Sequence, residues 1–565
     1  MRHQSTLSVV CGCLLLAGLG CAASPGGGGG EGGSSASGGS TGSGGSGSGS
    51  GGSTGNGGSS SGGSTGSGGS ASGGSTGSGG NVSTGGTIGS GGAKGGSSGS
   101  GGTTGTGGAK GGSTGSGGSS SGGSTGSGGS SSGGTTGSGG SSSTSCTITP
   151  TASTSTKIGT VGIVTFTTTL SSPTSAQIDF GLDTTYGMTA PVNLSTSMYR
   201  TLLLGMKPSK MYHYRVSVTN ASGTCTGGDN TIMTGAQPNG TLPTLMPTTQ
   251  NASAVYKGFV VTGEYIQSGG APAYIFDSDG AFVWWYNDGS DACGPRMSYD
   301  AQYMWIASAN VPDNTATDHV HRVTMDGLTD TDFTTSFAHH SHQVTPLPDG
   351  SVAFYTYGTG SNGCDDIRVL PANATPGTVP PVLVNSRTAH GGTGACHLNN
   401  IEYSPTDDAL IFSDLDNSCL TKIDRKTGTT IWVLNGGSPS GVMSTFTGDS
   451  YKGGEHGFQV VSVNDILLFN NNTGSSGGSQ AIEFKLDTSA KTSTKIWSYQ
   501  PSSAISVMVL GDVERLPNGN TIVNFGTGNT IQEVTSAGTM VQQIKSNSAF
   551  GFFEKRATLY GPSTK

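Results

Sequence analysis

A strand-pair pattern that returns at nearly constant intervals constrains the fold of this chain more than any other feature. Its three clearest copies begin at His342, His397 and His456, and a fourth copy without a histidine begins at Gly511. Successive copies start 55, 59 and 55 residues apart. In each copy an alternating strand is followed by a turn rich in Pro, Asn and Asp, and then by a second apolar strand. A repeat of this length with several strands per unit is typical of a β-propeller blade.

A second hairpin signature alternates with the first. It consists of an apolar strand, an Asp/Gly turn and a strand that often ends in an aromatic residue, and its clearest copies span 273–286 and 421–432. Weaker copies span 482–497 and 531–541, and another begins at His321. Each blade would then hold an inner and an outer strand pair, which predicts six blades over about 255–560, with five as the alternative. We expect the last apolar strand, near 552–560, to complete the first blade, and few helices anywhere because no segment keeps a 3.6-residue period.

Residues 146–236 read as seven or so short alternating strands, which is typical of a small β-sandwich. Within them, the run Leu-Gly-Met-Lys-Pro-Ser-Lys-Met-Tyr-His-Tyr-Arg-Val over 204–216 resembles the corner motif of fibronectin type III domains. Residues 237–254 hold three prolines and are expected to be a linker. The propeller would then occupy 255–565. The sequence therefore predicts an all-β chain with a fibronectin type III-like sandwich before a six-bladed propeller.

The N-terminal part predicts export. Residues 1–21 combine a short basic start with an apolar stretch too short to span a bilayer, and they end in small residues before Cys21. This end resembles a bacterial lipobox, so Cys21 is the expected lipidation site and would anchor the protein to the cell envelope. A plain cleaved signal peptide is the alternative. Residues 22–145 are almost wholly Gly, Ser and Thr, a composition that cannot bury a core and predicts a disordered stalk.

Charge and cysteine content narrow the function classes. The formal net charge is −8 and no basic cluster occurs, so nucleic acid is not an expected partner. Six cysteines remain after those of the N-terminal segment, and they are widely spaced and form no Cys-x-x-Cys motif. In an exported protein this pattern favours disulfides over a zinc site. From their places at strand ends, the expected pairs are Cys146–Cys225 and Cys396–Cys419, with Cys293–Cys364 as the remaining pair.

Three histidines at one blade position would converge on the propeller axis. A lone histidine on a propeller strand is most often a polar residue that lines a wet channel, but three equivalent ones can do chemistry together. They could hold zinc or iron, or one imidazole could be a nucleophile while the others donate hydrogen bonds to a developing anion. Bound metals usually need second-shell carboxylates or carbonyls. The residues after the histidines are Gln343, Leu398 and Gly457, so we favour the metal-free alternative and expect no cofactor.

The motifs together resemble the bacterial arylsulfate sulfotransferases over about 258–560. They are His-x-x-x-x-Leu-Pro-x-Gly from His342, His-x-Asn and Tyr-x-Pro-x-Asp-Asp from His397, and Glu-His-x-x-Gln around His456. The resemblance implies a six-bladed propeller that transfers a sulfuryl group from a phenolic sulfate donor to a phenol acceptor. It also implies that His456 is the nucleophile, and that His342, His397 and Asn399 bind the sulfate oxygens.

The chain departs from the family pattern at two places. Gly457 follows the nucleophile position where the family has an Asp or a similar residue, and Leu415 stands where the family has an arginine. Loss of that guanidinium would remove a bidentate clamp for the sulfate. Lys452 is a candidate substitute, as a point charge. Two other functions stay open: a non-catalytic propeller that binds a glycan, a peptide or an envelope partner, and a metal-dependent hydrolase or lyase.

Overall fold

The computed structural model describes residues 146–565 except 266–269, 288, 290–291, 309–318, 359–362, 438–439, 474–476 and 564. The predicted signal peptide, the lipidation site Cys21 and the predicted stalk lie outside the described residues. Within the described part of the chain, no helix is long and apolar enough to cross a membrane.

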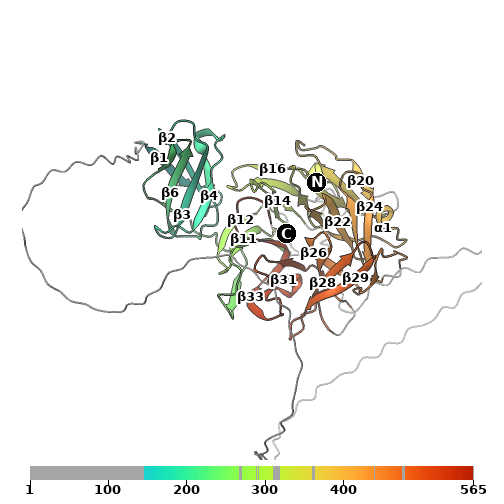
Figure 1. Ribbon diagram of the computed structural model, residues 1–565. Helices are drawn as coiled ribbons and strands as arrows, with labels where there is room; N and C mark the ends of the chain where they lie inside the picture. The colour runs from blue at the N-terminus through green and yellow to red at the C-terminus, as the bar shows by residue number, and fades with distance from the viewer. Residues whose placement is uncertain are drawn as a thin grey trace, which may run out of the picture. The chain divides into compact units, whose positions relative to one another are not determined.

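Six sheets of four or five strands make up the region from residue 245 onward, which confirms the six-bladed prediction (Figure 1). The first three run β34-β10-β11-β12, β13-β14-β15-β16 and β17-β18-β19-β20 from the inner strand outward. Their strands are β10 (Phe259–Tyr265), β11 (Ala273–Asp277), β12 (Phe282–Tyr286), β13 (Arg296–Met297), β14 (Tyr303–Ala307), β15 (Val320–Thr324), β16 (Asp330–Asp332), β17 (Thr345–Pro346), β18 (Val352–Thr356), β19 (Asp366–Leu370), β20 (Val382–Asn385) and β34 (Ala549–Arg556).

The other three sheets run β21-β22-β23-β24, β26-β27-β28-β29-β25 and β30-β31-β32-β33-β9. Their strands are β21 (Leu398–Ser404), β22 (Ala409–Asp414), β23 (Cys419–Asp424), β24 (Thr430–Asn435), β25 (Thr447–Gly448), β26 (Glu455–Ser462), β27 (Asp465–Asn470), β28 (Gln480–Asp487), β29 (Thr492–Tyr499), β30 (Asp512–Arg515), β31 (Thr521–Asn524), β32 (Thr530–Val534), β33 (Met540–Ser546) and β9 (Leu245–Thr249). All pairings are antiparallel except that of β25 with β29.

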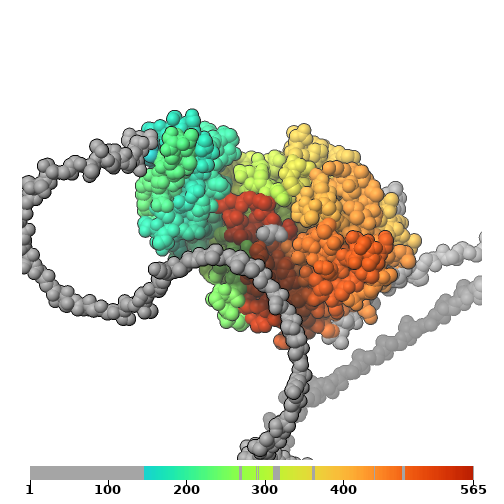
Figure 2. Space-filling view, viewed as in Figure 1, coloured from blue at the N-terminus to red at the C-terminus, as the bar shows by residue number. Residues whose placement is uncertain are grey.

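Two strands from opposite ends of this region close the ring. β34 pairs with β10 and so becomes the inner strand of the first blade, as predicted for the last apolar strand. β9 pairs with β33 on the outer edge of the last blade. The predicted linker 237–254 therefore includes a propeller strand, because the pairing of β9 with β33 joins the start of this region to its last blade. In the space-filling view the red C-terminal segments lie between the green start of the propeller and the orange segments that precede them in sequence (Figure 2).

The hydrophobic cores lie between neighbouring blades. One cluster joins Tyr355 and Ile367 of the third blade to Leu398, Ile401 and Phe412 of the fourth, and all five are almost fully buried. Strand β22 is buried along its whole length, because middle strands of a blade are covered on both faces. Burying a side chain of this size contributes about 1.5–3 kcal/mol.

The region 146–236 folds into two sheets, ordered β1-β2-β5 and β4-β3-β6-β7, with β8 also paired to β6. These strands are β1 (Ile148–Thr154), β2 (Gly162–Thr168), β3 (Ser175–Gly181), β4 (Met188–Pro191), β5 (Thr201–Leu203), β6 (Met211–Asn220), β7 (Gly223–Thr226) and β8 (Asn230–Met233). The Lys207 backbone N–H donates to the Tyr212 hydroxyl at 2.8 Å, a bond typical of a tyrosine corner. The fibronectin type III assignment itself stays a prediction.

Helices are few, as expected. The described residues hold one short α-helix, α1 (Ser386–His390), and three short 3₁₀ turns at Ser197–Tyr199, Thr334–Phe337 and Gly526–Gly528. Helix α1 ends at Gly391, which adopts a left-handed conformation with φ 76°.

The disulfides differ in part from those predicted. Cys146–Cys225 is confirmed, but the second disulfide joins Cys364 to Cys396. Cys396–Cys419 is wrong because Cys396 precedes β21 and Cys419 begins β23, while β22 lies between these strands in the sheet. The predicted Cys293–Cys364 pair is wrong as well, because Cys364 is bonded to Cys396. Cys293 and Cys419 are buried and belong to neither disulfide.

Candidate functional site

The histidines of the three motifs meet near the axis. His397 directly precedes β21, His456 is the second residue of β26, and His342 lies three residues before β17. The rings of His342 and His397 are 5.8 Å apart, and Phe552 of β34 lies 6.2 Å from His342 and 6.5 Å from His456. We call His342, His397 and His456 the histidine cluster. The repeat spacing therefore brought these three residues together as predicted.

His456 and Asn399 each lie at a break in the regular pairing register of their strand. The pairing of β26 with β27 shifts between Glu455 and Phe458, where His456 lies. The pairing of β21 with β22 shifts between Leu398 and Asn400, where Asn399 lies. Such irregularities re-aim side chains and are frequent beside active sites. Each inner strand thus starts with a local break that turns its polar residue away from the regular ladder.

Asn471 fixes the protonation of the His456 ring. The Asn471 side-chain amide donates to the backbone carbonyls of Val507 and Leu510, at 3.1 and 2.9 Å. Its oxygen must therefore accept from His456 Nδ1, which lies 2.7 Å away. In a neutral imidazole with the proton on Nδ1, the other nitrogen carries the lone pair. His456 Nε2 is thus prepared as an acceptor or a nucleophile.

Burial keeps this ring neutral. His456 is 3% exposed, and burial lowers its pKa to about 3. The hydrogen bond that His456 donates to Asn471 opposes this shift, and His397 adds to it. A buried imidazole cannot easily carry charge in a low-dielectric site. His456 therefore keeps its lone pair throughout the physiological pH range.

His342 is held in an uncommon backbone conformation. Its φ is 53°, in the left-handed region that few residues with a side chain adopt. The Ser341 hydroxyl lies 2.6 Å from His342 Nδ1, and burial, with the neighbouring histidines, lowers the pKa of His342 well below its usual value. Strain of this kind is often found at functional sites. His342 is thus a neutral ring in a fixed orientation.

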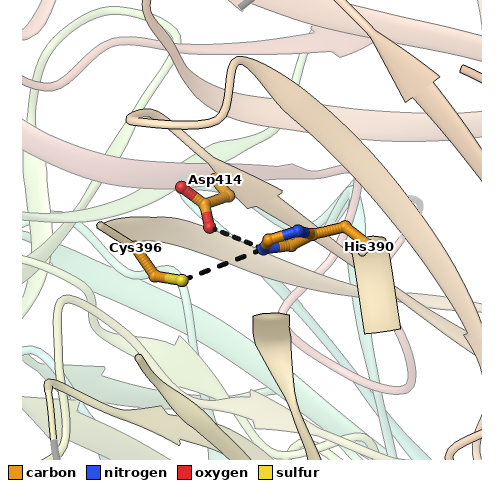
Figure 3. A group of neighbouring side chains, drawn as sticks. All are labelled: His390, Cys396 and Asp414. Carbon is orange, nitrogen blue, oxygen red and sulfur yellow. Dashed lines mark hydrogen bonds and ion pairs between the residues drawn. The ribbon is translucent and has the colours of Figure 1, made fainter. Parts of the chain in front are cut away.

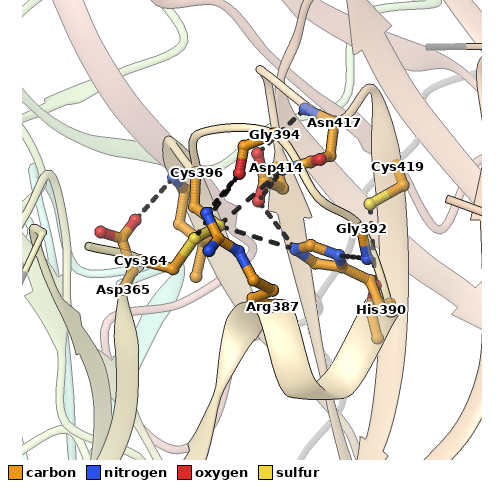
Figure 4. Close-up of polar contacts among 12 residues, drawn as sticks. Cys364, Asp365, Arg387, His390, Gly392, Gly394, Cys396, Asp414, Asn417 and Cys419 are labelled. Atoms are coloured by element: carbon orange, nitrogen blue, oxygen red, sulfur yellow. Dashed lines mark hydrogen bonds and ion pairs between the residues drawn. A yellow bond between two sulfur atoms is a disulfide. The ribbon is translucent and has the colours of Figure 1, made fainter. Parts of the chain in front are cut away.

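The backbone of His397 is anchored on every side. Its N–H donates to Asp414 Oδ1 at 3.2 Å, and its carbonyl accepts from the Leu415 N–H at 2.9 Å. The next N–H, that of Leu398, donates to Asp365 Oδ2 at 2.9 Å. The preceding residue, Cys396, is tied to Cys364 by the disulfide (Figure 4). His397 can therefore move little relative to the fourth blade.

Beside this anchor, His390, Cys396 and Asp414 bring three metal-ligating atoms within 4.8 Å of one another (Figure 3). However, the Gly392 N–H donates to His390 Nδ1 at 3.0 Å, so the ring proton is on Nε2, which donates to Asp414 Oδ2 at 3.1 Å. A metal would need this proton to leave and the Cys396 disulfide to be reduced. In the oxidised chain the group is a hydrogen-bonded scaffold.

The other predicted binding residues lie at different depths. Asn399 is fully buried, and its amide nitrogen donates to the carbonyl of Glu455, directly before His456, at 2.7 Å. Its side-chain oxygen is buried and has no hydrogen-bond partner. Lys452 is exposed on the loop before β26. Asn399 thus links β21 to β26 beside the histidine cluster, whereas Lys452 is exposed to solvent.

The two departures from the family pattern have structural counterparts. A β-carbon at Gly457 would lie 2.0 Å from Asp512 Oδ1, so only glycine fits there. A β-carbon at Gly454 would lie 3.4 Å from the Leu415 side chain. Leu415 therefore packs beside the loop that leads to His456, and puts an apolar group at the position where the sequence resemblance predicts an arginine.

Sequence reasoning noted Asp414 only as an acidic residue beside Leu415, with the wrong sign for a sulfate site. It missed the bond of Asp414 to the His397 backbone, and it missed Asn471 and the aromatic neighbours of the histidine cluster. Asn471 directly follows β27, and Tyr357, whose ring lies 5.7 Å from His397, directly follows β18. Phe552 belongs to a strand from the far end of the chain. The signal that could have found Asn471 is its place one residue after an apolar strand of a histidine-bearing blade.

Residues 385–556 match a family model described as Arylsulfotransferase (ASST). This segment contains His397, Asn399, Lys452 and His456, while His342 precedes it. No curated protein matches the chain.

Among solved structures, a structural genomics protein of unknown function from Bacteroides thetaiotaomicron is 13% identical with a TM-score of 0.32, over 71% of this chain and 98% of that one. The β-propeller domain of Cps50 (Swd1) from Myceliophteria thermophila is 11% identical with a TM-score of 0.35, over 54% and 90%.

Proposed function

We propose, from the arylsulfotransferase match over 385–556 and from the geometry at His456, that this chain is an exported arylsulfotransferase. It would move a sulfuryl group from a phenolic sulfate ester to a phenol through a covalent intermediate on His456. The observation that carries the proposal is the His456–Asn471 bond, which directs the lone pair of a neutral, buried imidazole away from its support. The two disulfides are consistent with export, and the lipid anchor at Cys21 is part of the proposal.

The reaction would take two steps. His456 Nε2 attacks the sulfur of the donor, an S–N bond forms, and the S–O bond to the donor phenol breaks. The acceptor phenol then attacks the same sulfur, the S–N bond breaks and His456 regains its lone pair. A sulfuryl group in flight resembles a metaphosphate-like group, so positioning and charge stabilisation would supply most of the rate.

The surroundings of His456 support its role as nucleophile and the roles of His342, His397 and Asn399 as sulfate-binding residues. His342 and His397 are at the distance from each other at which two rings can contact one small anion from different sides. Asn399, two residues after His397, donates to the carbonyl of Glu455, directly before His456. Phe552 and Tyr357 provide aromatic surfaces that suit a phenyl ring. Leu415 in place of the family arginine removes one fixed cation, so we expect slow turnover.

Turnover of a chromogenic aryl sulfate with a phenol acceptor tests the proposal directly. His456→Ala should abolish it, since no covalent path remains, whereas His342→Ala should lower it by about 10²–10³, as removal of one anion-stabilising donor does. Mass spectrometry after mixing the parent protein with donor alone should find a sulfuryl group on the peptide that contains His456. A label on another residue, or turnover by His456→Ala at the parent rate, would contradict the assignment. No turnover by the folded parent would favour the non-catalytic binding function.

A further inference from the structure

Four charged side chains from blades that are not neighbours meet close to the histidine cluster. Arg296 belongs to β13 of the second blade, Glu402 to β21 of the fourth and Asp512 to β30 of the sixth. Arg296 Nη2 donates to Glu402 Oε1 at 2.8 Å. Lys565 Nζ lies 2.5 Å from Asp512 Oδ1 and 3.6 Å from Glu402 Oε1. All four side chains are at most 9% exposed. Because blades that are not neighbours can touch only around the propeller axis, we call this group the axial ion cluster.

Asp512 supports the backbone that carries His456. Its Oδ1 packs against Gly457, directly after His456, since a β-carbon there would lie 2.0 Å from this oxygen. The Gly457 N–H donates to the carbonyl of Gly511, directly before Asp512, at 2.8 Å. The other oxygen, Oδ2, accepts from the Phe553 N–H of β34 at 3.1 Å. A shift of this carboxylate would therefore be felt at His456.

Arg296 extends the same support to His342. Its Nη2 donates to the side-chain oxygen of Gln343, directly after His342, at 3.0 Å. Its Nη1 donates to the Phe553 carbonyl at 3.1 Å. Arg296 is thus bound to the third blade, to the first blade and, through Glu402, to the fourth. The axial ion cluster contacts the residues that follow two of the three histidines.

We propose that the axis holds a seat for one primary ammonium group, and that Lys565 fills it as a positioning residue for His456. The seat consists of the Asp512 carboxylate, Glu402 Oε1 and the Phe553 carbonyl. In addition to the contacts above, Lys565 Nζ lies 2.6 Å from Asp512 Oδ2 and donates to the Phe553 carbonyl at 3.3 Å. Oxygen acceptors suit an ammonium group, which has three N–H donors and no acceptor. The inference rests on the proposed function, because it assigns Lys565 a role toward the nucleophile.

Charge balance makes the seat depend on its occupant. Of the residues that the structure describes, Lys565 is the one that forms an ion pair with Asp512. Removal of one partner of a buried pair leaves the other charge uncompensated, which is strongly unfavourable. Asp512 could then regain a counter-charge or water only by leaving its place against Gly457. The ammonium group therefore keeps the strand of His456 in position without touching substrate.

A small molecule can take the place of the lysine head group. A cavity of about 50 Å³ lies beside Lys565 and is also lined by Arg296 and Glu402. Lys565→Ala would enlarge this space by the ammonium group and most of its stem, and propylammonium has the size and charge of the part removed. Tetramethylammonium has the same charge but no N–H group. Comparison of these two cations separates a hydrogen-bonding seat from a general effect of salt.

Thermal unfolding of the full chain tests the seat without any turnover. Lys565→Ala should unfold at a lower temperature than the parent protein. Propylammonium should raise the midpoint of the variant by about 2–4 °C, because it binds only the folded chain. Tetramethylammonium should leave the variant unchanged, and propylammonium should leave the parent unchanged. A midpoint that responds equally to both cations, or to neither, would overturn the inference.

Histidine ring signals test whether the filled seat positions the nucleophile. In the full chain labelled with ¹⁵N at histidine, the His456 signal, assigned through His456→Gln, should move in Lys565→Ala. It should return toward its parent position when propylammonium is added. Lys485→Ala removes an exposed lysine from β28 of the same blade and is the matched control, which should leave the signal in place. A His456 signal that stays unmoved in Lys565→Ala would overturn the positioning role.

Kinetics add a readout that a loss of folded protein alone would not give. Lys565→Ala should lower kcat for a chromogenic aryl sulfate about tenfold to a hundredfold, with little change in KM, because His456 is displaced from the attacking position. Propylammonium should restore most of the loss. Lys565→Met keeps a stem of similar length in the seat, so it should be as slow and should not respond. Equal rescue of both variants, or a change in KM alone, would contradict the role.

The two proposals fail in different ways. Absence of turnover in the parent protein, together with the expected thermal and resonance changes in Lys565→Ala, would count against the proposed function and leave the ammonium seat in place. Normal turnover of Lys565→Ala without any added amine would overturn the positioning role and leave the proposed function in place.

Discussion

Removal of the Cys364–Cys396 disulfide should cost more activity and less stability than removal of Cys146–Cys225. The first disulfide closes 32 residues and the second 79. The loop entropy that a disulfide removes from the unfolded chain corresponds to about 3.7 kcal/mol for the shorter loop and about 4.5 kcal/mol for the longer one at 25 °C. Loop length alone therefore ranks Cys146–Cys225 as the more stabilising.

Activity should follow the opposite order because of what each disulfide holds. Cys396 directly precedes His397, and the two nearest backbone N–H groups after the disulfide donate to Asp414 and Asp365. Without the covalent bond, the glycine-rich loop 391–394 can shift His397, and a displacement of about 1 Å can cost about a hundredfold in rate. Cys146–Cys225 belongs to the sandwich, where Cys225 packs in a core with Val216 and Tyr214.

The assay compares two double variants, Cys364→Ala/Cys396→Ala and Cys146→Ala/Cys225→Ala. We expect kcat/KM for a chromogenic aryl sulfate to fall about a hundredfold in the first and less than threefold in the second. Urea unfolding should show the larger loss of stability in the second, in the transition of the sandwich. Full activity of the first variant, or equal losses in both, would refute the idea that this disulfide positions His397.

Two further predictions concern His456. Asn471→Leu should lower kcat with little change in KM, because the His456 ring loses the acceptor that keeps its proton on Nδ1. It also leaves the carbonyls of Val507 and Leu510 without their donor, at a stability cost of about 1–3 kcal/mol per group. An unchanged kcat would show that the tautomer is not set by Asn471. Because burial lowers the pKa of His456 to about 3, the unfolded chain binds a proton below pH 6.5 that the folded chain does not. The free energy of unfolding should then fall as pH drops from 6.5 toward 3, and His456→Gln should reduce this slope in urea titrations; an identical slope in both proteins would contradict it.

The sequence alone determined the repeat and the three histidines. Strand alternation and turns are local properties, and their return every 55–59 residues requires similar blades around an axis. Equivalent positions in such a ring must face the same centre, so His342, His397 and His456 could be brought together before any coordinates existed. The last strand, too, could be assigned to the first blade, because a closed ring needs a partner for its open edge.

Tertiary structure alone decided which groups support those histidines. Asn471 acts through its bond to His456, and Asp414 through its bonds to His390 and His397, and the spacing of the repeat does not record these contacts. The same holds for the Cys364–Cys396 disulfide, which crosses from the third blade to the fourth, whereas strand ends within one blade had suggested Cys419. Strand β9 was not predicted within the expected linker 237–254, because its pairing with β33 depends on the closed ring. Contacts between blades are set by the packing of whole sheets, and a local pattern cannot encode which neighbour a side chain will meet.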